Sequence, residues 1–66
     1  MALDKLKGRE IHVALLLKIG RSNKDIGSTL HMADRTVKHY ITSIMTKLNV
    51  DNRTQAALKL NGVVLP

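Results

Sequence analysis

Residues 22–48 read SNKDIGSTLHMADRTVKHYITSIMTKL, and this stretch decides the fold because it carries two sets of helix signals around a short turn. Ser22 can accept hydrogen bonds from the N–H groups of a first helical turn, and Asp25 suits the positive end of that helix. Asp34 can cap a second, longer helix in the same way. The stretch therefore predicts two helices joined by a tight turn, over about residues 22–30 and 34–48.

The longer predicted helix has two unlike faces. Its apolar side chains recur at helical spacing and form one stripe: Val37, Ile41, Ile44 and Leu48. The opposite face carries side chains that can all donate hydrogen bonds, and none of them is acidic: Arg35, Lys38, His39, Thr42, Ser43 and Thr46. A face that meets only solvent usually mixes both signs of charge, so this one is typical of a surface that meets phosphates and base edges.

The two predicted helices are expected to cross closely. Gly27 costs about 1 kcal/mol of helix propensity relative to alanine, and close packing explains why a glycine stands there. Apolar residues around it can lock the crossing: Ile26, Leu30, Met32, Val37 and Ile41. We therefore expect a helix-turn-helix unit whose second helix faces outward, where it can enter a major groove.

Helix signals continue on both sides of this unit. A helix over about residues 8–19 is expected to end at Gly20, because glycine readily adopts the left-handed conformation that closes a helix. Asn52, followed by Gln55, repeats a capping pattern and predicts a last helix over about residues 52–61. The sequence thus predicts an all-α, compact four-helix domain.

Composition narrows the class of protein. The 66 residues include no cysteine, which excludes disulfides and thiolate zinc sites. One tyrosine stands without phenylalanine or tryptophan, which disfavours binding of single-stranded nucleic acid by base stacking. The longest apolar run, Val13 to Leu17, is too short to span a membrane, and the charged residues near the N-terminus lead us to expect no signal peptide. The net charge of +6 indicates a polyanionic or acidic partner, although it also fits a protein kept soluble by self-repulsion.

No pattern for catalysis stands out. His12, His31 and His39 fall in three different settings without metal-ligand spacing, and Glu10 is the one glutamate. Ser43 lies four residues after His39 but has no acidic residue to orient the pair. We therefore expect neither an enzyme nor a bound cofactor or metal.

Short motifs recur at characteristic spacing from about residue 6 to residue 62. They are Leu6, Arg9-Glu10, Gly20-x-Ser22-Asn23-Lys24-Asp25-Ile26, Leu30, Thr36-Val37-Lys38, Ile44-x-x-Lys47-Leu48-x-Val50 and Asn52-Arg53-Thr54-x-Ala56. Together they resemble the LuxR/FixJ/NarL-type DNA-binding domain of bacterial transcription regulators. The sequence departs from that family's pattern at Gly27, Ala33 and Tyr40, where alanine, serine or threonine, and histidine are more frequent.

The resemblance implies a role for the chain as a whole. Residues 1–66 are expected to form a single domain from the C-terminal end of a longer cytoplasmic regulator, such as a response regulator of a two-component system. Its expected partners are double-stranded DNA, an upstream receiver or sensor domain, and RNA polymerase. The alternative is an interaction module that kept the fold but docks on an acidic protein.

The resemblance also implies roles for individual residues. Base contacts are expected from Lys38, His39 and Thr42. Phosphate contacts are expected from Ser22, Asn23, Lys24, Arg35, Thr36, Tyr40 and Lys47, of which Ser22 and Thr36 can instead serve only to cap or brace a helix.

Two structural roles follow for the last helix. The resemblance implies a bridge between Glu10 and Arg53 that ties the first helix to the fourth, with two independent exposed charges as the alternative. It also implies a homodimer, weak in isolation, through the outward residues Thr54, Leu58 and Asn61, with Val63 or Val64 as further contacts.

One stripe of the first helix does not fit the family's pattern. Ile11, Leu15 and Ile19 stand at i, i+4 and i+8, where charged residues are more frequent. Either a slightly rotated helix buries part of this stripe, or the stripe is a docking face for an absent upstream domain.

Overall fold

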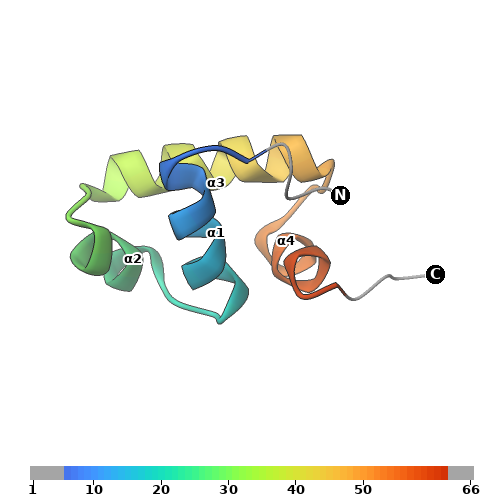
Figure 1. The fold of residues 1–66 in the computed structure, drawn as a ribbon, viewed down its shortest axis with the longest axis horizontal. Coiled ribbons are helices and arrows are strands. Elements are labelled where there is room, and N and C mark those ends of the chain that lie inside the picture. Colours follow the sequence, from blue (N-terminus) through green and yellow to red (C-terminus); the bar gives the residue numbers. More distant parts are fainter. Residues whose placement is uncertain (1–5, 63–66) are drawn as a thin grey trace.

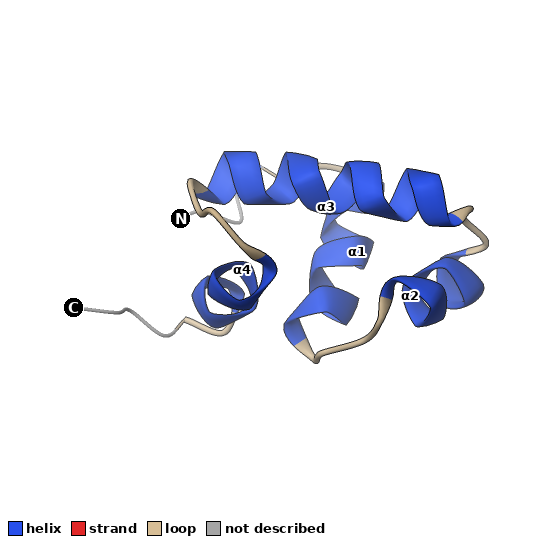
Figure 2. Ribbon diagram, turned by 180° about the vertical axis from the view of Figure 1, so that it is seen from behind, coloured by secondary structure: helices blue, strands red, loops and turns tan. Residues whose placement is uncertain are grey.

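The structure is a computed structural model that describes residues 6–62. This part of the chain contains four helices. They are α1 (Arg9–Lys18), α2 (Asn23–Leu30), α3 (Asp34–Leu48) and α4 (Arg53–Leu60), and no strand occurs between residues 6 and 62 (Figure 2). The predicted all-α, four-helix class is confirmed, and each predicted helix boundary lies within one residue of the observed one.

Two of the predicted helix caps are present. Ser22 Oγ accepts a hydrogen bond from the backbone N–H of Asp25 at 3.1 Å, and Asn52 Oδ1 accepts one from Gln55 at 2.9 Å. The predicted cap at Asp34 is wrong. Asp34 is already the first helical residue of α3, and the preceding Ala33 has extended backbone geometry but no side-chain oxygen to offer. Asp34 therefore acts on α3 through its charge, at the positive end of the helix.

Left-handed residues close the first three helices. At the end of α1 the N–H groups of Gly20 and Arg21 donate to the carbonyls of Leu17 and Leu16, at 3.0 and 3.1 Å. This paired pattern satisfies carbonyls that the helix itself cannot. Gly20 was predicted to end α1 in this left-handed conformation. His31 and Asn49, both with φ of 58°, adopt it at the ends of α2 and α3 although neither is a glycine. Histidine and asparagine are among the residues that tolerate this conformation best.

The long helix α3 lies along one side of the molecule, and the other three helices pack against its inner face (Figure 1). The predicted apolar stripe of α3 forms the centre of the core, since Val37, Ile41, Ile44 and Leu48 are all buried. Side chains from the other elements complete it: Leu6, Val13, Ala14, Leu17, Ile26, Ala56 and Leu60. As a result, the outer face of α3 is left facing solvent along its length.

The turn of the helix-turn-helix is tight at Gly27. A Cβ atom at this position would lie 2.5 Å from the carbonyl oxygen of Met32, and 3.5 Å from Cγ2 of Val37 on α3. The predicted close approach is therefore real, but its closest part is the backbone of the turn rather than the facing helix. Ile26 beside it is fully buried, whereas Leu30 and Met32 are half-buried against the core.

Candidate nucleic-acid interface

The outer face of α3 presents the side chains that the sequence predicted for contacts with bases. Lys38, His39 and Thr42 are all exposed, as are Arg35 and Thr46 on the same face. No acidic residue occurs between Arg35 and Lys47, so α3 itself contributes only positive charge to this face over that range. The structure thus brings the three predicted base-contacting residues together on one accessible surface.

Three hydroxyl groups on this helix are less available as donors than the sequence suggested. Thr42 Oγ1 donates to the carbonyl oxygen of Lys38 and Thr46 Oγ1 donates to that of Thr42, each at 3.0 Å. Ser43 Oγ donates to Glu10 Oε2 at 2.7 Å. The expectation of a face with donors throughout is therefore wrong in detail, because Lys38, Arg35 and His39 are the members that keep N–H groups directed at solvent.

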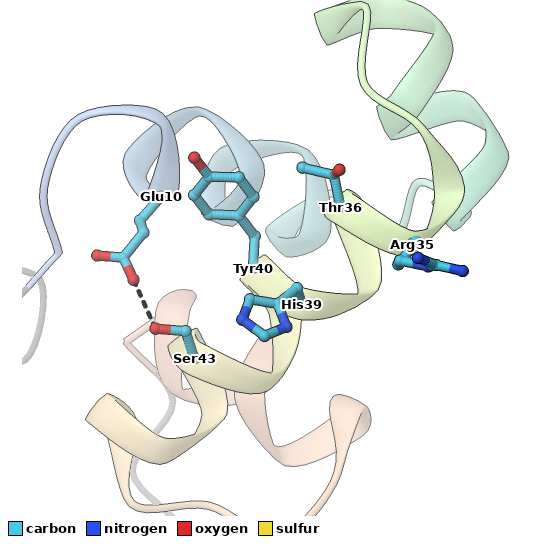
Figure 3. Close-up of a pocket in the computed structure, with 6 residues that line it drawn as sticks. All are labelled: Glu10, Arg35, Thr36, His39, Tyr40 and Ser43. Atoms are coloured by element: carbon cyan, nitrogen blue, oxygen red, sulfur yellow. Dashed lines mark hydrogen bonds between the residues drawn. The ribbon is translucent and has the colours of Figure 1, made fainter.

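Glu10 lies at the edge of this face and fixes α1 to α3. Its carboxylate accepts hydrogen bonds from Lys47 Nζ at 2.5 Å, from Ser43 Oγ at 2.7 Å and from the backbone N–H of Lys7 at 3.2 Å. Figure 3 shows Glu10 reaching from α1 to Ser43 on α3, beside the ring of Tyr40. Glu10 is only 8% exposed, and it is the one buried charged residue in the range 6–62.

The surroundings of Glu10 favour its ionised form. The hydrogen bond from Lys47 contributes most, followed by that from Ser43, and together they lower the pKa of the Glu10 carboxyl from 4.5 to about 2 although burial opposes the shift. The ion pair with Glu10 also occupies Lys47, whose side chain is 35% exposed. The ammonium predicted to contact a phosphate is therefore held at the α1–α3 junction.

The predicted bridge between Glu10 and Arg53 is wrong. Arg53 instead donates to Oδ1 of Asn23, at the start of α2, and to the carbonyl oxygen of Arg21 just before it. The fork of the guanidinium suits these two acceptors, which lie together where the chain enters α2. Arg53 thus ties α4 to the beginning of the helix-turn-helix, while Glu10 ties α1 to its second helix.

The other predicted phosphate contacts lie around the start of α2 and in the first two turns of α3. Lys24 is exposed in the first turn of α2, and the neighbouring Ser22 hydroxyl and Asn23 carbonyl oxygen are engaged in the cap and with Arg53. Arg35, Thr36 and Tyr40 line a groove beside Glu10, with Arg35 at the far end of the group from Glu10 (Figure 3). Tyr40 is half-buried and packs against the core.

The residues predicted for a dimer contact differ in what they already bind. Thr54 is exposed, and Leu58 is half-buried and lines a shallow groove between α1 and α4. Asn61 Nδ2 donates to the carbonyl oxygens of Lys18 and Ala57, at 3.1 and 2.8 Å, so it also closes the end of α4 against α1. Val63 and Val64 lie outside the described residues.

Sequence reasoning missed one contact that holds α4 in place. Lys59 Nζ donates to the carbonyl oxygen of Leu48 at 2.7 Å, at the negative end of α3. The sequence carries no local signal for this contact, because it joins two residues eleven positions apart across the turn into α4. With Asn61 and Arg53, Lys59 gives α4 hydrogen bonds to α3, α1 and the entry of α2.

The stripe on α1 is exposed. Ile11, Leu15 and Ile19 have 41%, 54% and 62% of their surface accessible, so the helix is not rotated enough to bury them. Ile11 and Leu15 border a narrow apolar groove that Leu60 of α4 closes on its other side. Among residues 6–62 no helix is both long and apolar enough to cross a membrane.

A compact four-helix unit with an exposed, basic second helix in its helix-turn-helix defines a DNA-binding domain of a transcription regulator. Comparison with protein families agrees, because residues 4–60 match the family described as bacterial regulatory proteins, luxR family. The chain belongs to this LuxR family, which makes it a regulatory DNA-binding domain and not an enzyme.

Relatives with known names share this region. The chain is 44% identical over 55 residues, 83% of its length, to the transcriptional regulatory protein LiaR of Bacillus subtilis. It is 41% identical over 57 residues, 86% of its length, to the transcriptional regulatory protein DegU of Brevibacillus brevis. It is 40% identical over 55 residues, 83% of its length, to the response regulator protein VraR of Staphylococcus aureus. The matched regions are 26%, 24% and 26% of LiaR, DegU and VraR, so the chain spans about a quarter of each relative.

Proposed function

We propose that this domain recognises a specific duplex DNA sequence by placing α3 in the major groove, with Lys38, His39 and Thr42 as the residues that contact bases. The observation that carries the proposal is the outer face of α3, which is exposed, basic and free of acidic residues between Arg35 and Lys47. A lysine can donate to O6 and N7 of guanine, and a threonine offers a hydroxyl oxygen and a methyl group.

Phosphate contacts position the helix. Lys24 and Arg35 are the main candidates, because both are exposed cations, Lys24 in the first turn of α2 and Arg35 in the first turn of α3. Ser22, Asn23, Thr36 and Tyr40 add neutral hydrogen-bonding groups around them. Lys47 contributes chiefly by holding Glu10, so its phosphate contact would require the ion pair with Glu10 to be shared or opened.

The domain acts as the output part of a longer regulator in the bacterial cytoplasm. Three relatives are regulators about four times as long as the matched region, and VraR is named a response regulator, which supports a two-component system. In that setting an upstream receiver or sensor domain controls the output, and RNA polymerase is a further partner. The regulator binds paired half-sites as a homodimer through α4, around Thr54, Leu58 and Asn61.

A titration of binding against salt concentration tests the proposal. Binding through phosphates releases counterions, so the logarithm of the association constant should fall with the logarithm of salt with a slope near −0.9 per neutralised phosphate. Selection of bound duplexes from a random library should then enrich one sequence. A shallow slope without enrichment, together with binding to an acidic protein surface, would support the interaction-module alternative and contradict DNA recognition.

A further inference from the structure

Two threonines on the outer face of α3 share one feature, because the hydroxyl group of each donates a hydrogen bond to a carbonyl of the same helix. Thr42 Oγ1 donates to the carbonyl of Lys38, and Thr46 Oγ1 donates to the carbonyl of Thr42, both at 3.0 Å. Both side chains are exposed. Their outward chemistry is therefore not that of a free hydroxyl group.

A threonine hydroxyl has one proton to donate. While that proton is hydrogen-bonded to a backbone carbonyl, Oγ1 can offer only its acceptor lone pairs to a ligand. The hydrogen bond holds Oγ1 against the preceding turn, and the Cγ2 methyl is the other branch of the side chain at Cβ. Thr42 thus presents carbon and an acceptor oxygen to whatever meets α3.

Among the four bases, thymine alone carries a methyl group in the major groove. The adenine paired with it offers an N6–H donor there, which suits an acceptor oxygen. Guanine presents the acceptors N7 and O6, which do not. We propose that Thr42 recognises the 5-methyl group of one thymine, an inference that rests on the proposed function of α3 as the helix in the groove.

Thr46 provides a matched control for Thr42. It makes the same type of hydrogen bond and is also exposed, but it lies one turn further from the start of α3. In helix-turn-helix proteins the N-terminal part of the recognition helix contacts base edges. We therefore assign the methyl contact to Thr42 and expect Thr46 to face the backbone beyond it.

The test begins with a duplex selected from a random library by the 66-residue chain. Each thymine of that duplex is then replaced, one at a time, by deoxyuridine, which lacks only the methyl group. One replacement should weaken binding about fourfold, as expected for one buried methyl. Thr42→Ser, which loses the methyl but keeps the hydroxyl, should bind the thymine duplex about fourfold more weakly and no longer respond to that replacement.

Thr42→Val keeps a methyl and removes the acceptor oxygen, so it should keep the response to deoxyuridine that Thr42→Ser loses. Ser, Thr and Val have similar helix propensities, and equal melting temperatures confirm that the variants fold alike. The inference is overturned if no thymine replacement weakens binding, if Thr42→Val loses the response to deoxyuridine as Thr42→Ser does, or if the response is lost in Thr46→Ser instead. Enrichment of no sequence in the selection would contradict the proposed function itself.

Discussion

Glu10 links the first helix to the third through one carboxylate, and its lowered pKa connects that contact to the pH dependence of stability. Because the pKa falls from 4.5 in the unfolded chain to about 2 in the fold, the stabilisation is complete above about pH 4.5 and is lost as the pH drops toward 2. The contribution is on the order of 2 kcal/mol, since the partly exposed Lys47 moderates the pair.

We therefore expect Glu10→Gln to lower the free energy of unfolding at pH 7 and to have a much smaller effect at pH 2. Urea denaturation at the two pH values measures the difference. Asp51→Asn is a suitable control, because it removes an exposed carboxylate. An equal loss of stability at both pH values would show that Glu10 acts through packing rather than through its charge.

Two lysines in the proposed interface should behave differently toward DNA. Lys38→Ala should weaken binding to the selected duplex by roughly 1–3 kcal/mol and relax the preference at one base pair. Lys24→Ala should weaken binding to all duplexes by a similar factor and make the salt slope shallower by about one. Equal losses on selected and random DNA for both variants would contradict this division between base and phosphate contacts.

For the charged residues of the motifs, the sequence predicts which residues have a role better than it predicts which residue each one contacts. The motif residues Glu10, Lys47 and Arg53 were each assigned to a role, yet the pairing of Glu10 with Lys47 depends on how α1 lies across α3. That crossing is set by the packing of the core and not by a local pattern. The same reason explains why the hydrogen bonds that occupy Thr42, Ser43 and Thr46 could not be read from their spacing alone.

At the scale of the elements, the turn between α2 and α3 depends on the missing side chain of Gly27. Alanine normally stabilises a helix interior by about 1 kcal/mol relative to glycine. Here its Cβ would meet the carbonyl oxygen of Met32 at 2.5 Å, so the turn would have to move. We expect Gly27→Ala to lower the melting temperature and weaken DNA binding, as thermal denaturation and a binding titration would show.

Ser28→Ala is the control for this prediction, because Ser28 is the exposed neighbour in the same helix. It should leave stability nearly unchanged. If Gly27→Ala instead raised the melting temperature, the turn would have room for a Cβ and close approach would not explain the glycine.

The exposed stripe of α1 leads to a prediction of small effect. Leu15→Glu should change the melting temperature of the domain little, because Leu15 is 54% exposed and a charge there stays hydrated. Leu17→Glu, two residues further along the same helix, should cost several kcal/mol, because Leu17 is 1% exposed and an unpaired charge is costly in the core. A severe loss of stability in Leu15→Glu would contradict the exposure.

The elements were predictable because their signals are local. Ser22 and Asn52 cap α2 and α4 as their positions indicated, and Gly20 closes α1. The start of α3 was placed correctly although its cap was not, since Ala33 occupies that site without a polar side chain. The left-handed conformations of His31 and Asn49 were not predicted, because neither residue type requires that conformation. Both residues adopt it where the chain turns from one helix into the next.

For the whole molecule, the proposed homodimer predicts how the regulator occupies paired half-sites. Leu58→Asp places a charge in the proposed contact on α4 and should abolish cooperative binding to two half-sites. Binding to a single half-site should be unchanged, which also shows that the variant folds. Electrophoretic mobility shifts on one and two half-sites measure both quantities.

Gln55→Asp is the matched control, because it adds a charge on the exposed surface of α4 outside the proposed contact. Cooperativity should survive this change. Cooperative binding that persists in Leu58→Asp would remove α4 from the interface between the two copies.

The connections between the helices have a consequence for how the chain reaches its fold. Only residues 19–22, 31–33 and 49–52 separate one helix from the next. Closing such short loops costs little chain entropy, so each helix can meet its neighbour early, whereas the contacts of α1 with α3 and with α4 must join more distant parts of the chain. Helical domains of this kind fold in microseconds to milliseconds. Transient opening of the domain is therefore followed by rapid refolding, so proteases gain access mainly according to the equilibrium fraction of open molecules.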